Sequence, residues 1–87
     1  MASYSVELTR SAERDIQDIG DRATRARLFA RIQALAREPR PPGCEKLFGG
    51  SRRYRVRAGD YRILYDVDDG LRIVAVVKVG HRREVYR

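Results

Sequence analysis

Basic side chains alternate along the segment 52–57, where Arg53, Arg55 and Arg57 are separated by single residues. In an extended strand, residues two apart point to the same side of the sheet. Alternation in the next two predicted strands adds more basic residues to that side: Arg62, Arg72 and Lys78. It also adds three apolar residues, which are expected to form a floor: Leu64, Val74 and Val76. Guanidinium groups offer forked donors that match phosphate oxygens, so the pattern predicts a surface that binds phosphate.

The excess of positive charge lies mainly in the C-terminal part of the chain. The sequence has 19 Lys and Arg against 12 Asp and Glu, a formal charge of +7. Basic residues exceed acidic ones by two in 1–51 and by five in 52–87. A positive field attracts nucleic acids, acidic proteins and anionic membranes alike. Because the arginines gather on one strand face, the pattern favours RNA over a role in solubility alone.

Length and composition predict one folded domain, 1–87. The 87 residues allow a single core, and 43% hydrophobic with 36% charged residues is typical of a globular chain. No apolar run approaches the roughly 20 residues that span a bilayer, and no secretory signal pattern is present. We therefore expect a cytoplasmic protein with no membrane partner. Cys44 is the single cysteine, and neither it nor any other pattern indicates a disulfide, a metal site or a cofactor.

The N-terminal half predicts one strand and two helices. Polar and apolar residues alternate over 5–8, which is typical of a short strand. Ser11 is expected to cap a helix that stops at Gly20, and Asp21 to cap a second helix. The second helix has an apolar stripe: Leu28, Ile32 and Leu35. The two helices are expected to form a hairpin.

The remaining residues predict a connector and three strands. Prolines and glycines are frequent in 38–50, so no regular structure beyond a local turn is expected there. Strands are predicted over 52–57, 60–67 and 71–79, joined by short turns as an antiparallel meander. The fold class is therefore α+β, with two layers in which the N-terminal strand and the helical hairpin pack on an antiparallel sheet.

The C-terminal half resembles the RelE/ParE toxin superfamily, and within it the RelE-type toxins. The residues that carry the resemblance read RVRAGDYRILYDV over 55–67 and VGHRREVYR over 79–87. The resemblance extends over nearly the whole chain through the helical hairpin and Lys46-Leu47. It implies a RelE-like fold and a toxin of a type II toxin-antitoxin system, held in check by a cognate antitoxin. The implied activity is that of a messenger-RNA interferase, an endonuclease that enters the ribosome and inhibits translation.

The resemblance also implies site residues and a reaction that needs no metal. The ribose 2′-hydroxyl attacks the neighbouring phosphate, so charge builds on the phosphate oxygens while protons leave the 2′-oxygen and reach the 5′-oxygen. By position, the implied catalytic residues are Arg53, Arg55, Arg62, Arg82 and Tyr86, with His81 as a secondary candidate. The expected RNA-binding residues are Arg53, Arg55, Arg57, Lys78 and Arg83.

The group that transfers the proton is left open between two residues. Tyr86 has an ordinary pKa of about 10 and needs nearby positive charge, from Arg82 or Arg83, to favour its phenolate. His81 is the only histidine, and its ordinary pKa of about 6.5 suits proton transfer near neutral pH. Two other functions are also left open. One is a ParE-like poison of DNA gyrase, and the other is an RNA-binding module without catalysis.

Overall fold

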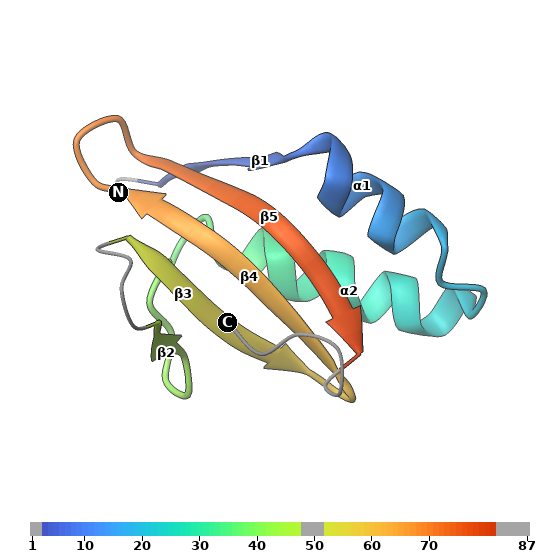
Figure 1. Cartoon of the computed structure of the whole chain (residues 1–87). Coiled ribbons are helices and arrows are strands. Elements are labelled where there is room, and N and C mark those ends of the chain that lie inside the picture. The colour runs from blue at the N-terminus through green and yellow to red at the C-terminus, as the bar shows by residue number, and fades with distance from the viewer. Residues whose placement is uncertain (1–2, 48–51, 82–87) are drawn as a thin grey trace.

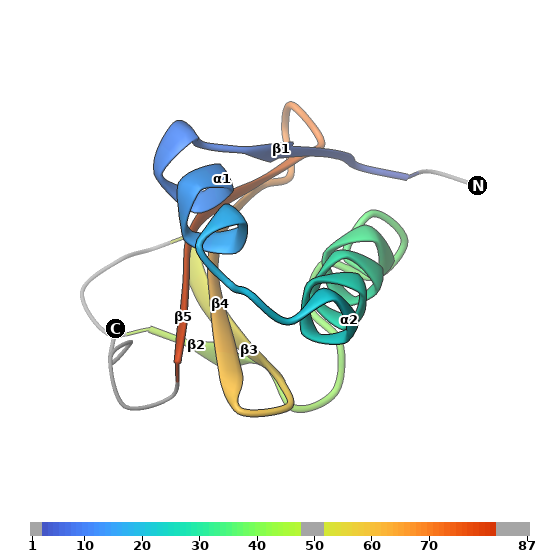
Figure 2. The same ribbon diagram turned by 90° about the vertical axis from the view of Figure 1, so that its right-hand side faces the viewer.

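The computed structural model describes residues 3–47 and 52–81 (Figure 1). The elements in chain order are β1 Ser5–Leu8, α1 Arg10–Gln17, α2 Arg22–Ala34, β2 Glu45–Lys46, β3 Arg53–Ala58, β4 Tyr61–Asp68 and β5 Ile73–His81. The five strands form one sheet in the order β1-β5-β4-β3-β2. Both helices lie on one side of it, as the turned view shows (Figure 2). The predicted two-layer α+β architecture is confirmed.

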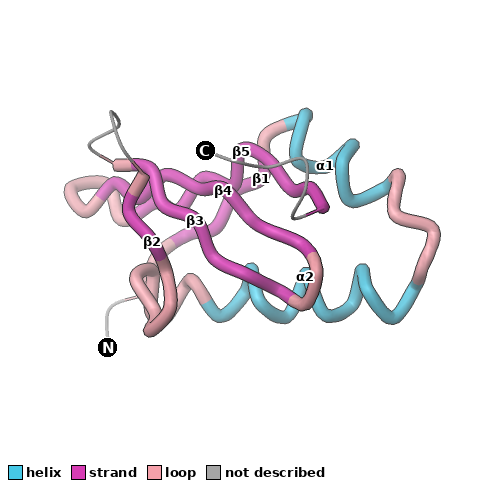
Figure 3. The backbone as a smooth tube through the Cα atoms, turned by 60° about the horizontal axis from the view of Figure 1, so that its bottom comes forward, coloured by secondary structure: helices cyan, strands magenta, loops and turns pink. Residues whose placement is uncertain are grey.

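The sheet is wider and less uniform than the predicted meander. β3, β4 and β5 are antiparallel as expected, but β1 joins the edge of β5 in a parallel direction. At the other edge, β2 pairs with β3, with Glu45 opposite Arg55 and Lys46 opposite Tyr54 (Figure 3). The expectation of no regular structure in 38–50 was therefore wrong at these two residues. A strand of two residues is too short for periodicity to indicate it.

The helices begin at side-chain caps, one of which differs from the prediction. The hydroxyl of Thr9, not of Ser11, accepts a hydrogen bond from the Ala12 amide at 3.1 Å, so α1 starts directly after β1. Asp21 caps α2 as predicted, because its carboxylate accepts from the Thr24 amide at 3.2 Å. The predicted stripe of α2 is buried against the sheet: Leu28, Ile32 and Leu35. α1 packs mainly on β5 and α2 on β3.

A β-bulge in β5 reverses which side chains face the helices. Leu64 pairs with Lys78, but the next residue, Tyr65, pairs with Val76, so Val77 is the extra residue. A one-residue shift exchanges the two faces of a strand. The alternation predicted for β5 is therefore wrong before the bulge and correct after it.

The bulge removes most of the predicted apolar floor. Val74 and Val76 are buried in the core with the helices rather than on the arginine side of the sheet. Ile73 and Ala75, which were expected to face the helices, pair with Asp68 and Asp66 and share their side. Of the predicted floor, only Leu64 remains on the arginine side.

The loop between β4 and β5 is longer than predicted. It contains Arg72, which was expected to lie in a strand with the other arginines. β5 begins at Ile73, so Leu71 and Arg72 belong to the loop and not to the strand. Arg72 has a left-handed backbone with φ 57°, and its guanidinium carbon lies 6.0 Å from the ring centre of Tyr4. Arg72 was therefore wrongly assigned to the phosphate-binding surface.

A polar cluster attaches the connector to this loop. Arg40 donates to both carboxylate oxygens of Asp69, at 3.1 and 2.8 Å, and to the Tyr54 hydroxyl at 2.9 Å. The Tyr4 hydroxyl donates to Asp69 at 2.6 Å. These hydrogen bonds lower the pKa of Asp69 to about 2, with the largest contribution from Arg40. Residues far apart in the sequence are thus joined around one carboxylate.

Candidate anion-binding site

The side of the sheet opposite the helices, called here the outer face, carries the alternating arginines. In β3, Tyr54, Val56 and Ala58 are buried toward the helices. The intervening residues therefore point outward: Arg53, Arg55 and Arg57. Alternation in β4 places Arg62 and Leu64 on the same face, and Lys78 pairs with Leu64. The shared face predicted for these residues is present.

At one end of the outer face, the arginines are neutralised by aspartates of β4. Arg53 donates to both carboxylate oxygens of Asp66, at 2.7 and 3.0 Å. This pairing raises the pKa of the Arg53 guanidinium. Arg52 donates to Asp68 at 3.0 Å. A phosphate group has to compete with a carboxylate for Arg53, so this end of the face is a poor place for an anion.

Glu45 of β2 is a functional candidate that the sequence did not indicate. Arg55 donates from Nε to Oε1 of Glu45 at 2.9 Å, and its Nη2 donates to the same oxygen. Arg55 lowers the pKa of the Glu45 carboxyl, with smaller contributions from Arg62 and Arg57. The only signal that would have found it is the strand pairing of Glu45 with Arg55, which periodicity does not predict.

Arg57 and Arg62 stand at the other end of the outer face, beside the hairpin that joins β3 to β4. They are direct partners in the strand register. The hairpin has a two-residue loop, in which Gly59 adopts the positive φ, 63°, that a tight turn of this kind requires. Within the described residues, neither side chain forms a hydrogen bond or an ion pair, and the Nε of Arg62 is buried without a partner. Buried unpaired donors are costly, so this end favours an anion.

Lys78 is turned toward the edge of the sheet. Its ammonium lies 3.9 Å from the carboxylate of Asp15 in α1. The same Asp15 oxygen accepts a hydrogen bond from the backbone amide of Val79 at 3.0 Å. Lys78 is therefore held partly by a carboxylate of α1, and it contributes less to the outer face than its position in the strand predicted.

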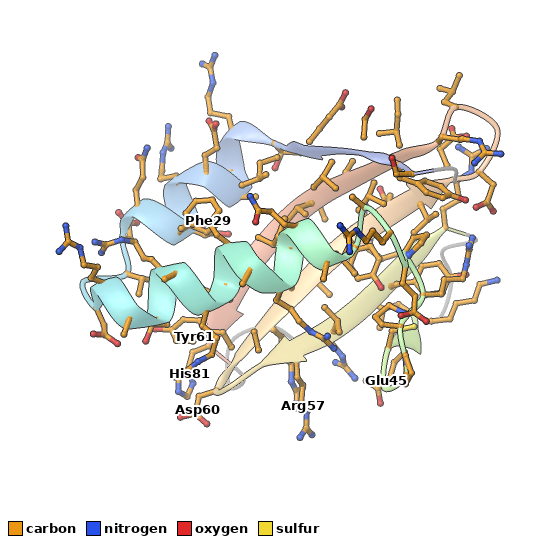
Figure 4. All side chains as sticks on the ribbon, turned by 180° about the vertical axis from the view of Figure 1, so that it is seen from behind. Phe29, Glu45, Arg57, Asp60, Tyr61 and His81 are labelled. Atoms are coloured by element: carbon orange, nitrogen blue, oxygen red, sulfur yellow. The ribbon has the colours of Figure 1, made fainter. Side chains whose placement is uncertain are left out.

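His81 lies on the helix side of the sheet, away from Arg57 and Arg62. It pairs with Tyr61 in the register, and the two rings meet edge to face with centres 5.7 Å apart (Figure 4). Both residues line a pocket of about 440 Å³ together with Asp15 and Asp18 of the α1 end. The structure does not bring His81 to the arginines of the outer face.

Three predicted site residues fall outside the described residues: Arg82, Arg83 and Tyr86. β5 ends at His81, at the same end of the sheet as the β3–β4 hairpin. In residues 3–47 and 52–81, no group of three His, Cys, Asp or Glu side chains is placed to hold a metal ion. No helix of this described part is long and apolar enough to cross a membrane.

Together, the fold and the outer face define a small basic α+β protein whose sheet carries a row of arginines on the side opposite the helices. The sequence model of a family described as "ParE toxin of type II toxin-antitoxin system, parDE" matches residues 6–86. The chain therefore belongs to the RelE/ParE family and is a toxin of the type II toxin-antitoxin class.

Relatives within this family include RelE-type toxins. The chain is 33% identical over 86 residues to Toxin RelG of Mycobacterium tuberculosis, covering 97% of both sequences. It is similar in structure to a chain of the RelBE2 toxin-antitoxin complex of the same organism, with a TM-score of 0.82, 29% identity and coverage of 93% of this chain and all of that one. The RelE–RelB complex of Pyrococcus horikoshii contains a similar chain, with a TM-score of 0.81, 26% identity and coverage of 94% and 98%.

Proposed function

We propose that this toxin is a ribosome-dependent endoribonuclease that cleaves messenger RNA and so inhibits translation in the cytoplasm. The observation that carries the proposal is Arg62, whose buried Nε has no partner in the described part of the chain and which faces a second arginine. Buried polar groups are almost always paired, so an unpaired buried donor is a candidate for a functional site. RNA as the target is what the resemblance to RelE-type toxins implies, and the 33% identity to Toxin RelG is in line with that resemblance.

In the proposed reaction, the 2′-oxygen of a ribose attacks the adjacent phosphorus while the bond from phosphorus to the 5′-oxygen breaks. The products are a cyclic phosphate and a free 5′-hydroxyl. Arg62 and Arg57 stabilise the charge that grows on the phosphate oxygens, because within the described part of the chain no side chain engages their guanidinium donors at the hairpin end. Arg55 joins them once it exchanges its carboxylate partner for phosphate. Arg53 contributes mainly to holding the strand pair, since Asp66 occupies its donors.

The proton steps are assigned to Tyr86, with Arg82 or Arg83 favouring its ionised form. His81 is ranked second, because its ring lies with Tyr61 on the helix side of the sheet. Lys78 and the remaining arginines of the outer face contribute attraction to the RNA backbone. The toxin is expected to be held inactive by a cognate antitoxin, as similar chains occur in RelB complexes.

Primer extension on messenger RNA from a translating extract tests the proposal. Purified toxin should produce discrete cleavage sites, the same protein with Arg62→Ala should not, and naked RNA should be cut far less. Binding of the antitoxin should suppress the cuts.

A second candidate is a poison of DNA gyrase, which the description of the matching family as ParE favours. It is tested in parallel by adding the toxin to gyrase and supercoiled plasmid. Gyrase-dependent DNA breaks together with intact messenger RNA would show that the protein is a gyrase poison and not an endoribonuclease. RNA binding with neither outcome would indicate a binding module without catalysis.

A further inference from the structure

Glu45 occupies the donors with which Arg55 would otherwise bind phosphate. Nε and Nη2 form the forked edge of a guanidinium, and both donate to Oε1 of Glu45. The two residues are direct partners between β2 and β3, so the backbone register holds the carboxylate opposite the guanidinium. A phosphate cannot use that edge of Arg55 until the carboxylate leaves it.

When a phosphate binds, Glu45 is the partner that can move away, because Arg55 is the more buried of the two residues. The Arg55 side chain is only 18% exposed, whereas that of Glu45 is 62% exposed. β2 is a two-residue strand at the edge of the sheet, so Glu45 has solvent on its open side. Ion pairs with a solvent-exposed partner contribute little to stability, so a phosphate can replace the Glu45 carboxylate at small cost.

Glu45 also reduces the positive field of the neighbouring arginines. Arg55 contributes most to lowering the pKa of the Glu45 carboxyl, and Arg62 and Arg57 contribute less. All three guanidiniums therefore act on this one carboxylate. The Arg53–Asp66 pair differs, because both partners come from central strands of the sheet and each is partly covered. Among the carboxylates of the outer face in residues 3–47 and 52–81, Glu45 is thus the one that opposes Arg57 and Arg62.

We propose that Glu45 is a positioning residue that acts as an internal counter-ion: it holds Arg55 in the absence of RNA, gives way to an incoming phosphate, and thereby limits the affinity of the outer face for RNA. This inference rests on the proposed function for the identity of the anion. It predicts that removing the charge of Glu45 strengthens RNA binding, which is the opposite of what loss of a structural contact does.

The test measures binding of a single-stranded oligoribonucleotide with 2′-O-methyl riboses, which lacks the attacking hydroxyl and stays intact. Glu45→Gln should bind about threefold to fivefold tighter than wild type at low salt, the equivalent of one surface ion pair. Its dependence of log K on log salt should be steeper by about 0.7, as one more phosphate contact on a single strand requires. Thermal unfolding of each variant verifies that the fold is intact.

Two matched variants separate the local effect from net charge. Glu7→Gln adds the same unit of charge on β1, at the opposite edge of the sheet from β2, and should change affinity by less than half as much. In an Arg55→Ala background, Glu45→Gln should give no gain, because the carboxylate acts through Arg55. Equal gains from Glu7→Gln and Glu45→Gln, or a gain that persists without Arg55, would overturn the proposal.

Failure of this inference and failure of the proposed function give different results. If Glu45→Gln binds RNA like wild type but no longer cleaves it, Glu45 takes part in the chemistry and is not a counter-ion. If no variant binds RNA, the proposed function fails, and the same proteins, with Arg55→Ala as the reference for the double variant, are titrated with inorganic polyphosphate. A gain with polyphosphate that depends on Arg55 then still supports the counter-ion role, and its absence rejects it.

Discussion

Arg57 of β3 and Arg62 of β4 face each other directly across the antiparallel pair, one residue pair away from the Ala58–Tyr61 closure of the hairpin. Like charges in such positions destabilise a sheet by about 0.2–1 kcal/mol. Within the described residues, no carboxylate is in ion-pair contact with either guanidinium. The arrangement costs stability in the free protein, and an anion bound between the two side chains would offset that cost.

Replacing Arg57 with Gln should therefore stabilise the fold and weaken RNA binding at the same time. The free energy of unfolding is expected to rise by about 0.2–1 kcal/mol, because one of two opposed charges is removed. The dependence of log K on log salt should become shallower by about 0.7. Urea unfolding and binding titrations measure the two effects, with Arg37→Gln as a control of equal charge on the exposed residue after α2. If the salt dependence of binding is unchanged in Arg57→Gln, Arg57 is an ordinary solvated side chain that does not contact phosphate.

Arg62→Ala should reduce cleavage much more than it reduces binding. Arg62 is proposed to stabilise charge that grows in the transition state, and loss of such a donor costs on the order of a hundredfold or more in rate. Single-turnover cleavage and equilibrium binding are measured on the same ribosome complexes. Arg62→Lys keeps the charge but not the forked donors, so it should recover binding better than rate. Equal losses in rate and affinity for Arg62→Ala would show a role in binding only.

Tyr86→Phe should suppress cleavage, whereas His81→Gln should have a small effect. The Phe variant keeps the aromatic ring and removes the ionisable oxygen, which separates proton transfer from stacking. His81 contacts Tyr61 on the helix side of the sheet, so its loss leaves the arginines of the outer face in place. Normal cleavage by Tyr86→Phe together with an inactive His81→Gln would make His81 the proton-transfer residue.

The protein should lose stability in acid as Asp69 becomes protonated. Hydrogen bonds from Arg40 and Tyr4 lower the pKa of Asp69 from 3.8 to about 2 in the folded state. The contribution of this group is therefore fully present above its unfolded value and is lost as the pH falls from 3.8 toward about 2. Urea unfolding followed across this range should show a smaller acid dependence for Asp69→Asn, which should also be less stable than wild type at pH 7. Identical acid profiles would mean that the cluster adds nothing to stability.

The β-bulge is tested by placing the same substitution on either side of it. Val76→Thr introduces a hydroxyl into the core and should destabilise the protein by about 1–3 kcal/mol. Val77→Thr makes the same change at the extra residue of the bulge, which is only half-buried, and should cost less than half as much. A larger loss of stability for Val77→Thr than for Val76→Thr would indicate that β5 follows the uninterrupted alternation predicted from the sequence.

The sequence by itself determined the family and all the helices and strands except β2. Alternation and capping residues predicted β1 at 5–8, the start of α2 after Asp21, and the three long strands to within one or two residues. These features depend on neighbours in the chain, for which period and propensity are sufficient. The placement of Arg53, Arg55, Arg57 and Arg62 on one face follows from the same local rule. The motifs at 55–67 and 79–87 were sufficient for the RelE/ParE resemblance that the family match confirms.

Only the tertiary structure decided which arginines are available to an anion. The ion pairs of Arg53 with Asp66 and of Arg55 with Glu45 join strands through a register that one sequence does not specify. The bulge at Val77 moved Val74 and Val76 into the core, because pairing with β4 overrides the alternation of an isolated strand. His81 likewise shares a face with Tyr61 through strand pairing. Local patterns therefore predicted the basic face, whereas contacts between distant residues left Arg57 and Arg62 as the arginines of β3 and β4 without a carboxylate partner among the described residues.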